Sequence, residues 1–376
     1  MKPRIIIAPN SFKSSIDSFR ICQIVEKELR ENITEDCIID TMPIGDGGDG
    51  TGYIIARNLG SIKKYYRTVD PLGRKRNSPI YISKHTAIIE MADVSGLRLL
   101  DPEDYSPRTA SNEGLGKLIS KLYLEGVTKL ILCIGGSATI DMGLGVIKAL
   151  GARFYDANDD EIFVLDMKNL KEIKRIDSSL LKRFHNLKID ILCDVENPLL
   201  GDNGAVRVYG PQKGVKDYDV ELYVEQHAYM CSFLERMFDL SLANMKYGGA
   251  AGGLPIVFSC FFNVELFQGT SYILDLLDFD NKLIDCKLLI SGEGCMDSQT
   301  SFGKAPYIIA NLAGHSCDNI VAINGQTKSL PKVFTHSYSL SDYSSDLNEA
   351  INNPEPYLRK VAQSIAKLIN DNNILS

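Results

Sequence analysis

Short apolar runs that end at glycine or acidic residues recur along this chain, and they constrain its fold more than any other feature. Arg4–Ala8 is rich in β-branched residues, and Lys129–Ile134 is an apolar run that ends directly before two glycines. Runs of this length and composition predict buried strands. Segments with helical spacing lie between such runs, for example around Leu115, Leu118 and Leu122. Strands that alternate with helices predict an α/β fold with a parallel sheet.

The middle of the chain departs from this alternation. From Tyr65 the apolar pattern has a period of two, and residues 65–69, 79–83 and 86–91 predict antiparallel strands. Clear α/β order returns in the last hundred residues. The pattern therefore predicts that the two ends of the chain share one sheet and that the middle is inserted into it.

We accordingly expect two domains. Residues 1–64 and 284–376 are expected to form a Rossmann-like α/β domain, a parallel sheet with helices on both faces. Residues 65–283 are expected to form a large inserted α/β domain with antiparallel strands. The active site is expected in the cleft between the two domains.

Composition and charge exclude several classes of partner. The 376 residues include 41 basic and 48 acidic ones, a net charge of −7, which disfavours electrostatic binding to nucleic acid or anionic membranes. The nine cysteines form no C-x-x-C pair, and several lie in apolar runs, as is typical of reduced thiols in a cytoplasmic protein. The uncharged stretch Tyr247–Val264 contains four glycines and a proline, which favours a glycine-rich loop over a membrane helix.

Five segments that follow predicted strands carry glycine, hydroxyl or acidic residues. They span residues 9–13, 45–51, 135–141, 193–214 and 291–304. In parallel α/β sheets, ligands bind outside the carboxyl ends of the strands. Each segment alone also has a structural explanation, such as a turn, an N-cap or close packing of a helix against the sheet.

Together, the groups in these segments suit phosphoryl transfer from a magnesium nucleotide. Glycine-rich loops let backbone amides bind phosphate, lysines neutralise its charge, and carboxylates hold a divalent cation or accept a proton. The chain has no Walker A, H-E-x-x-H or G-x-S-x-G motif. The loop through Gly143 and Gly145 has Lys148 in place of the third glycine of the dinucleotide-binding fingerprint.

These motifs resemble those of the bacterial type I glycerate kinases over nearly the whole chain. The matching blocks include IIIAPNSFK (5–13), GDGGDGT (45–51), IGGSAT (134–139), CDVENPLLGDNGA (193–205), YGPQKG (209–214) and SGEGCMDSQTSFGKAP (291–306). Their order and spacing also agree with the family. The resemblance implies a two-domain α/β enzyme that phosphorylates D-glycerate with ATP and Mg²⁺, usually to 2-phosphoglycerate.

The chemistry and the resemblance together define the candidate site residues. The candidates for catalysis are Lys13, Asp46, Asp194, Glu293 and Asp297, and the candidate metal ligands are Asp194, Glu293 and Asp297. The candidates for binding substrate or phosphate are Ser11, Gly47, Gly48, Gly135, Gly136, Ser137, Thr139, Asn197, Gln212, Lys213, Gln299 and Lys304. Which acid is the base and which ligates the metal stays open.

Five residues depart from the pattern of the family, and three of them, at positions 10, 140 and 295, motivate an alternative. The five are Asn10, Ile140, Met142, Pro255 and Cys295, where the family usually has aspartate, asparagine, glycine, glycine and arginine. Cysteine lacks both the charge and the planar fork of arginine. The alternative is a non-catalytic or altered-specificity relative that binds a small hydroxy-acid or a nucleotide. An oxidoreductase with a dinucleotide cofactor ranks lower, and the oligomeric state stays open.

Overall fold

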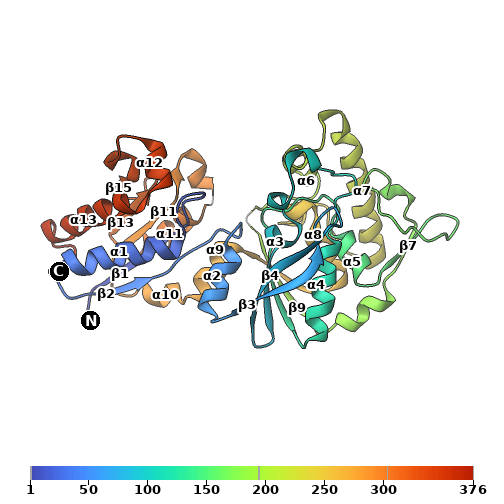
Figure 1. Cartoon of the computed structure of the whole chain (residues 1–376), viewed down its shortest axis with the longest axis horizontal. Helices are drawn as coiled ribbons and strands as arrows, with labels where there is room; N and C mark the ends of the chain where they lie inside the picture. The colour runs from blue at the N-terminus through green and yellow to red at the C-terminus, as the bar shows by residue number, and fades with distance from the viewer. Residues whose placement is uncertain (1, 194, 303, 376) are drawn as a thin grey trace. The chain divides into compact units, whose positions relative to one another are not determined.

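The chain folds into two compact units, each with its own sheet (Figure 1). A computed structural model describes residues 2–193, 195–302 and 304–375, without the side chains of Gln299 and Phe302. Unit 1 comprises Met1–Asp46 and Thr270–Ser376, and unit 2 comprises Gly47–Gly269. The middle of the chain is therefore inserted between the two segments of unit 1.

Unit 1 is built on a five-stranded parallel sheet in the order β15-β13-β11-β1-β2. Its strands are β1 (Arg4–Pro9), β2 (Ile38–Thr41), β11 (Cys286–Gly292), β13 (Asn319–Asn324) and β15 (His336–Ser339), and β12 (Cys295–Met296) and β14 (Gln326–Thr327) form a separate parallel pair. Its helices are α1 (Ser18–Asn32), α9 (Gly269–Leu276), α10 (Phe279–Lys282), α11 (Ala305–Ala313), α12 (Leu347–Asn352) and α13 (Glu355–Asp371).

The core of unit 1 lies on both faces of β1. Ile5 and Ile7 pack in one apolar cluster with α1 and α13, which run side by side (Figure 1). Ile6 points to the opposite face because side chains alternate along a strand, and it is also fully buried. Helix α1 begins at Ser18 because the side chain of Asp17 accepts a hydrogen bond from the backbone N–H of Arg20.

Unit 2 is built on a six-stranded mixed sheet in the order β10-β9-β6-β5-β4-β3. Its strands are β3 (Ile62–Val69), β4 (Lys75–Ser83), β5 (Thr86–Glu90), β6 (Lys129–Cys133), β9 (Lys188–Cys193) and β10 (Asn263–Gln268), and β7 (Arg153–Tyr155) pairs with β8 (Arg175–Asp177) outside the sheet. The pairs β3–β4 and β4–β5 are antiparallel, and the other neighbours in the sheet are parallel.

Helices and short turns surround the sheet of unit 2. The helices are α2 (Thr51–Asn58), α3 (Met91–Ser95), α4 (Glu113–Leu124), α5 (Leu144–Ala149), α6 (Ala205–Tyr209), α7 (Val220–Phe238) and α8 (Leu254–Phe261). Turns of 3₁₀ helix in the two units span Leu97–Leu99, Pro102–Asp104, Leu170–Glu172, Ser179–Phe184, Pro211–Lys213, Asp217–Asp219, Ala250–Gly252, Ser298–Phe302 and Leu340–Tyr343.

The predicted fold class is confirmed. The two ends of the chain share a parallel sheet, and antiparallel strands lie in the inserted part. The limits of the units differ from the expected ones at residues 64 and 284. Helix α2 packs against β4, β5 and β6 and so belongs to unit 2. The Thr270 hydroxyl donates to the carbonyl of Gly45, a contact that ties the start of α9 to unit 1. The expected cleft between the domains stays a prediction.

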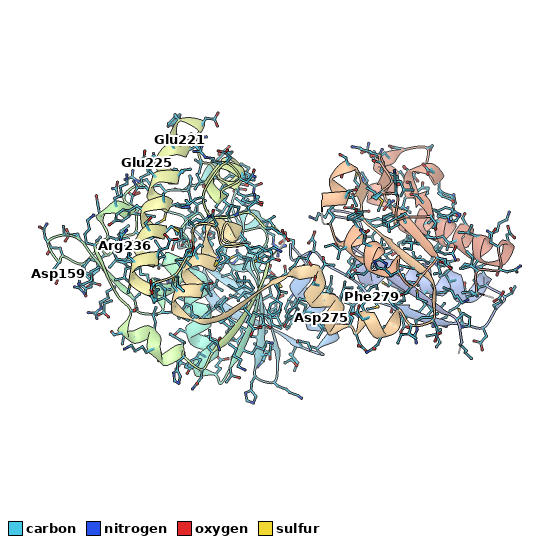
Figure 2. The ribbon with its side chains drawn as sticks, turned by 180° about the vertical axis from the view of Figure 1, so that it is seen from behind. Asp159, Glu221, Glu225, Arg236, Asp275 and Phe279 are labelled. Atoms are coloured by element: carbon cyan, nitrogen blue, oxygen red, sulfur yellow. The ribbon has the colours of Figure 1, made fainter. Side chains whose placement is uncertain are left out.

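Two elements lie in parts of the chain where the apolar residues have no clear period. Helix α7 is long, and its exposed residues Glu221, Glu225 and Arg236 mark the side that faces solvent (Figure 2). Strand β10 follows the glycine-rich stretch and is parallel to β9 at the edge of the sheet.

Across the part of the chain that the structure describes, no helix combines the length and apolarity needed to cross a lipid bilayer.

A buried histidine on α7 connects this helix to the loop that follows β6. His227 is fully buried, its Nε2 lies 2.8 Å from the carbonyl oxygen of Ile140, and its Nδ1 has no hydrogen-bond partner among the described residues. Burial lowers the pKa of His227 to about 4, and the contact with Ile140 opposes that shift only in part. The native state therefore binds the proton of this imidazole more weakly than the unfolded chain does.

We predict that His227 makes the protein less stable as the pH falls from about 6.5 to about 4. In this range the unfolded state binds more protons at this site, so the free energy of unfolding decreases with falling pH, by about 3 kcal/mol for this shift. Urea unfolding at several pH values would measure it. The variant His227→Gln keeps an amide donor for Ile140 but does not titrate, so its pH dependence should be shallower. Identical slopes for both proteins would contradict the prediction.

Candidate active site

The two central strands of unit 1 bring two of the predicted segments together. Strands β1 and β11 are parallel neighbours, and Pro9 pairs with Gly292 at their carboxyl ends. The first segment continues from Pro9 into Asn10, and the second continues from Gly292 into Glu293. Asn10 and Glu293 are 283 positions apart in the chain, so it is the pairing of the two strands that places them at one edge of the sheet.

A lysine lies between two carboxylates at this edge. The Nζ atom of Lys304 is 3.1 Å from Oε2 of Glu293 and 3.4 Å from Oδ1 of Asp297. Burial favours a lower pKa for Lys304, but its hydrogen bond to Glu293 and the charges of both carboxylates outweigh this effect and raise the pKa. Lys304 is therefore cationic at neutral pH, and the three groups form one charged cluster.

Buried polar groups hold Glu293 in place. The hydroxyl of Thr300 donates to Oε1 of Glu293 at 2.7 Å and accepts from the backbone N–H of Asp297 at 3.1 Å. The backbone N–H of Glu293 donates to Oδ1 of Asn324, at the end of β13, at 3.2 Å. Thr300 and Asn324 are fully buried. These fixed contacts preorganise the carboxylate, and neither residue was among the candidates.

This cluster lines a cavity in unit 1 of about 510 Å³. Ser11, Lys13 and Asp46 also line it, and Nζ of Lys13 is 4.0 Å from Oδ2 of Asp46. The cavity thus contains both acidic and basic candidates from three segments that follow β1, β2 and β11. Its size is in the range of pockets that bind small molecules.

Two glycine-rich candidate segments meet in unit 2. A Cβ atom at Gly135 would lie only 2.6 Å from Cα of Gly48, so the loop after β6 packs directly on the loop before α2. Gly136 has a φ of +70°, in the left-handed region that favours glycine. The four candidate glycines at 47, 48, 135 and 136 therefore lie side by side.

The lysine candidate of unit 2 lies beneath the loop after β6. Lys213 is buried, and its Nζ donates to Oγ of Ser137 at 2.7 Å and to the carbonyl of Thr139 at 2.9 Å. The Thr139 hydroxyl accepts a hydrogen bond from the side chain of Asn112, which also donates to the carboxylate of Asp141. Ser137, Thr139 and Lys213 are thus brought together as one network.

Two buried carboxylates that were not candidates hold these loops. Glu90 ends β5 and accepts hydrogen bonds from the backbone N–H groups of Gly50 and Tyr53. Asp141 accepts four, from the backbone N–H groups of Asn112, Gly143 and Gly145 and from the side-chain amide of Asn112. Burial raises the pKa of each carboxyl group, and the amide donors oppose that shift. The sequence carries one signal for Glu90, since it is an acidic residue at the end of an apolar run that predicts a strand.

Of the four remaining candidates, the side chains of Asn197 and Gln212 are described and those of Asp194 and Gln299 are not. The side chain of Asn197 donates to the carbonyl of Asn203 and accepts from the hydroxyl of Tyr209, so both ends of its amide hold a local loop. Gln212 is exposed in the turn Pro211–Lys213. Asp194 and the side chain of Gln299 lie outside the described residues.

The described residues offer a pair of carboxylates for a metal, and no larger group. Among them, no three histidine, cysteine, aspartate or glutamate side chains are close enough to hold a metal ion by themselves. Glu293 and Asp297 converge on the ammonium group of Lys304. Such a pair fits Mg²⁺, which in phosphoryl-transfer sites takes one or two protein carboxylates and completes its shell with phosphate oxygens and water.

Comparisons with known proteins identify the family of this chain. The sequence profile of the Glycerate kinase family matches residues 5–370. A relative named glycerate 2-kinase from Escherichia coli K12 is 36% identical over 86% of this chain and 85% of its own length. A glycerate kinase from Halalkalibacterium halodurans is 34% identical over 96% of this chain and 97% of its own. A crystal structure of a candidate glycerate kinase 2 from Salmonella typhimurium LT2 has a TM-score of 0.86 and 31% identity, and covers 99% of this chain and 100% of that one.

The fold and these matches define a kinase, a phosphotransferase that uses ATP. The chain belongs to the glycerate kinase family. The predictions of family, fold class and enzyme class are confirmed, whereas the roles of individual residues stay predictions.

We predict that Gly135→Ala destabilises unit 2 because the new Cβ atom would overlap Cα of Gly48. The free energy of unfolding should decrease by about 1–3 kcal/mol, the usual cost of overpacking. The matched control is Gly314→Ala, where the nearest atom to a new Cβ is 3.4 Å away and φ is −60°. Denaturant unfolding would compare both variants with the parent protein. Equal stability of all three would show that the two loops do not pack as described.

Proposed function

We propose that this protein transfers the γ-phosphoryl group of ATP to a hydroxyl group of D-glycerate and releases phosphoglycerate and ADP. Membership of the glycerate kinase family supports this function. The observation of the structure that supports it best is the cluster in which Glu293 and Asp297 contact Lys304 at the carboxyl edge of a parallel sheet. This edge carries both signs of charge, as a site for a metal nucleotide and an anionic substrate requires.

In the proposed reaction, the oxygen of a glycerate hydroxyl forms a bond to the γ-phosphorus while the bond from that phosphorus to the bridging oxygen of ATP breaks. The hydroxyl proton passes to a carboxylate. Asp46, Glu293 and Asp297 are the described candidates for this base and for ligands of Mg²⁺, and Asp194 is a further candidate from the sequence. Bound Mg²⁺ would neutralise charge on the phosphates.

The basic side chains and the amides of the loops then have complementary roles. Lys13 and Lys304 would neutralise phosphate or the carboxylate of the substrate. The raised pKa of Lys304 keeps it charged at the pH of the reaction. In unit 2, the loop from Gly135 to Thr139 would bind an anion through its backbone N–H groups, with the ammonium of Lys213 beneath it.

We further propose that the product is 2-phosphoglycerate and that the protein acts in the cytoplasm. The name of the Escherichia coli relative, glycerate 2-kinase, supports the position of the phosphoryl group. Cysteines within apolar strands, such as Cys133 in β6 and Cys193 in β9, support a reducing compartment.

Incubation with MgATP and a panel of small hydroxy-acids and sugar acids tests the function. We expect ADP release that depends on D-glycerate and on Mg²⁺, and a phosphorus NMR spectrum of the product that shows an ester at carbon 2. Release with another acid instead would indicate altered specificity. Binding of nucleotide or glycerate without ADP release from any acid would contradict the proposal and favour a binding protein.

We predict that Glu293→Gln lowers kcat by at least 100-fold, because it removes a charge that the site holds in a fixed position. The matched control is Glu31→Gln, an exposed position at the end of α1 in the same unit, which should keep full activity. Steady-state kinetics, with circular dichroism to check folding, would measure both. A folded Glu293→Gln enzyme with normal kcat would remove this residue from the catalytic group.

Asp194 is tested separately because its candidacy rests on the sequence alone. We expect Asp194→Asn to lose most of its phosphoryl-transfer activity, since an amide neither accepts the proton as a base nor ligates Mg²⁺ as a carboxylate does. Full activity in that variant would remove Asp194 both as a base and as a metal ligand.

A further inference from the structure

The cavity of unit 1 has walls of two different kinds. One wall is polar and holds the charged cluster, and its side chains include Ser11, Lys13, Asp46, Glu293, Asp297 and Lys304. The other wall is apolar and is formed by Phe12, Leu340, Leu347, Ala350 and Ile351. We call the second set the apolar wall. This lining suits a ligand that has both a charged part and an apolar part.

Most of the apolar wall is one face of helix α12. Leu347, Ala350 and Ile351 are spaced three and four residues apart, so they lie on the same side of the helix. Ala350 is buried, but Leu347 and Ile351 are 42% and 40% exposed. Two large aliphatic side chains are thus left partly in water at the wall of a cavity, where a bound ligand could cover them.

The apolar wall is anchored to the polar segment after β1. The hydroxyl of Ser15 donates to the carbonyl of Ile351 at 2.6 Å. At the other end of α12, the carboxylate of Asp346 accepts a hydrogen bond from the backbone N–H of Asn348 at 2.9 Å. Phe12, which precedes Lys13 in the same segment, belongs to the apolar wall itself. Both walls are therefore held in a fixed relation within unit 1.

Of the two substrates in the proposed reaction, only the nucleotide has both a charged part for the polar lining and an apolar part for the apolar wall. Glycerate has three carbon atoms, each of which bears oxygen, so it has no apolar surface for Leu347 and Ile351 to cover. The base of ATP is a flat ring with two faces that gain free energy when they are buried against aliphatic side chains. The triphosphate at the other end of the molecule needs cations such as Lys13 and Lys304.

We propose that unit 1 binds the nucleotide, with the base of ATP against the apolar wall of α12 and the phosphates toward Lys13 and Lys304. This inference rests on the proposed function and deepens it, because it assigns the binding site of the base. The cavity of about 510 Å³ is in the size range of small-molecule pockets. A second cavity, in unit 2, has about 150 Å³ and is below that range.

The test separates the base from the phosphates of the ligand. The full-length variants Ile351→Asn and Leu347→Asn each make one position of the apolar wall polar, and Leu312→Asn, an equally exposed leucine on α11, is the matched control. Calorimetry would measure the dissociation constant of ADP, and competition with ADP would measure that of inorganic tripolyphosphate, which has no base. Steady-state kinetics would give the KM for ATP and for glycerate.

We expect each variant of the apolar wall to bind ADP and ATP about tenfold or more weakly, because most of the burial free energy of one aliphatic side chain is lost. Tripolyphosphate binding and the KM for glycerate should change less than twofold, and Leu312→Asn should match the parent protein. If Ile351→Asn does not fold, Leu347→Asn alone tests whether the base binds at the apolar wall.

Unchanged ADP affinity in a folded variant of the apolar wall would overturn the assignment, and so would an equal loss of affinity for ADP and tripolyphosphate. These results are distinguishable from a failure of the proposed function. If the parent protein releases ADP with glycerate but the variants bind ADP normally, only the assignment of the base fails. If the variants lose ADP affinity selectively but no acid is phosphorylated by the parent protein, the proposed function fails and the nucleotide site stands.

Discussion

The parallel pairing of β1 with β11 is the constraint on which unit 1 depends. Both strands have apolar, buried centres, and the pairs from Ile5–Leu288 to Pro9–Gly292 set their register. Because parallel strands end at the same edge, this register brings Asn10 next to Glu293 through backbone pairing. A shift by one residue would turn Ile5 and Ile7 away from α1 and would separate the two polar segments.

Acidic residues serve two physical purposes in this chain, and exposure to the cavity distinguishes them. Glu90 and Asp141 are buried and use their oxygens on backbone N–H groups of the loops, so they are part of the loop structure. Glu293 and Asp297 line the cavity of unit 1 and contact the ammonium group of Lys304. The first pair holds the loops through backbone amides, and the second pair carries the catalytic and metal-binding roles proposed above.

Local patterns in the sequence predict the strands and the segments that follow them, because burial and turn chemistry act over a few residues. Arg4–Ala8 and Lys129–Ile134 were expected as strands and are β1 and β6. Contacts between distant residues were not predictable in this way. The role of Glu90 depends on amides 40 residues away, and the placement of α2 depends on which sheet it packs against. The apolar wall also arises only when α12 meets the segment after β1.

The insertion of unit 2 into unit 1 also has a consequence for synthesis on the ribosome. Strand β1 is complete by residue 9, but its partner β11 ends at residue 292, after all of unit 2. At 5–20 residues per second, roughly 10–50 s pass between the synthesis of residue 46 and that of residue 292. During this time β2 is the one strand of its sheet with which β1 can pair, so the edge of β1 that later receives β11 stays open and can be bound by a chaperone. The amino-terminal segment is therefore made first, but its sheet cannot be completed until unit 2 and the strands that follow it have been synthesised.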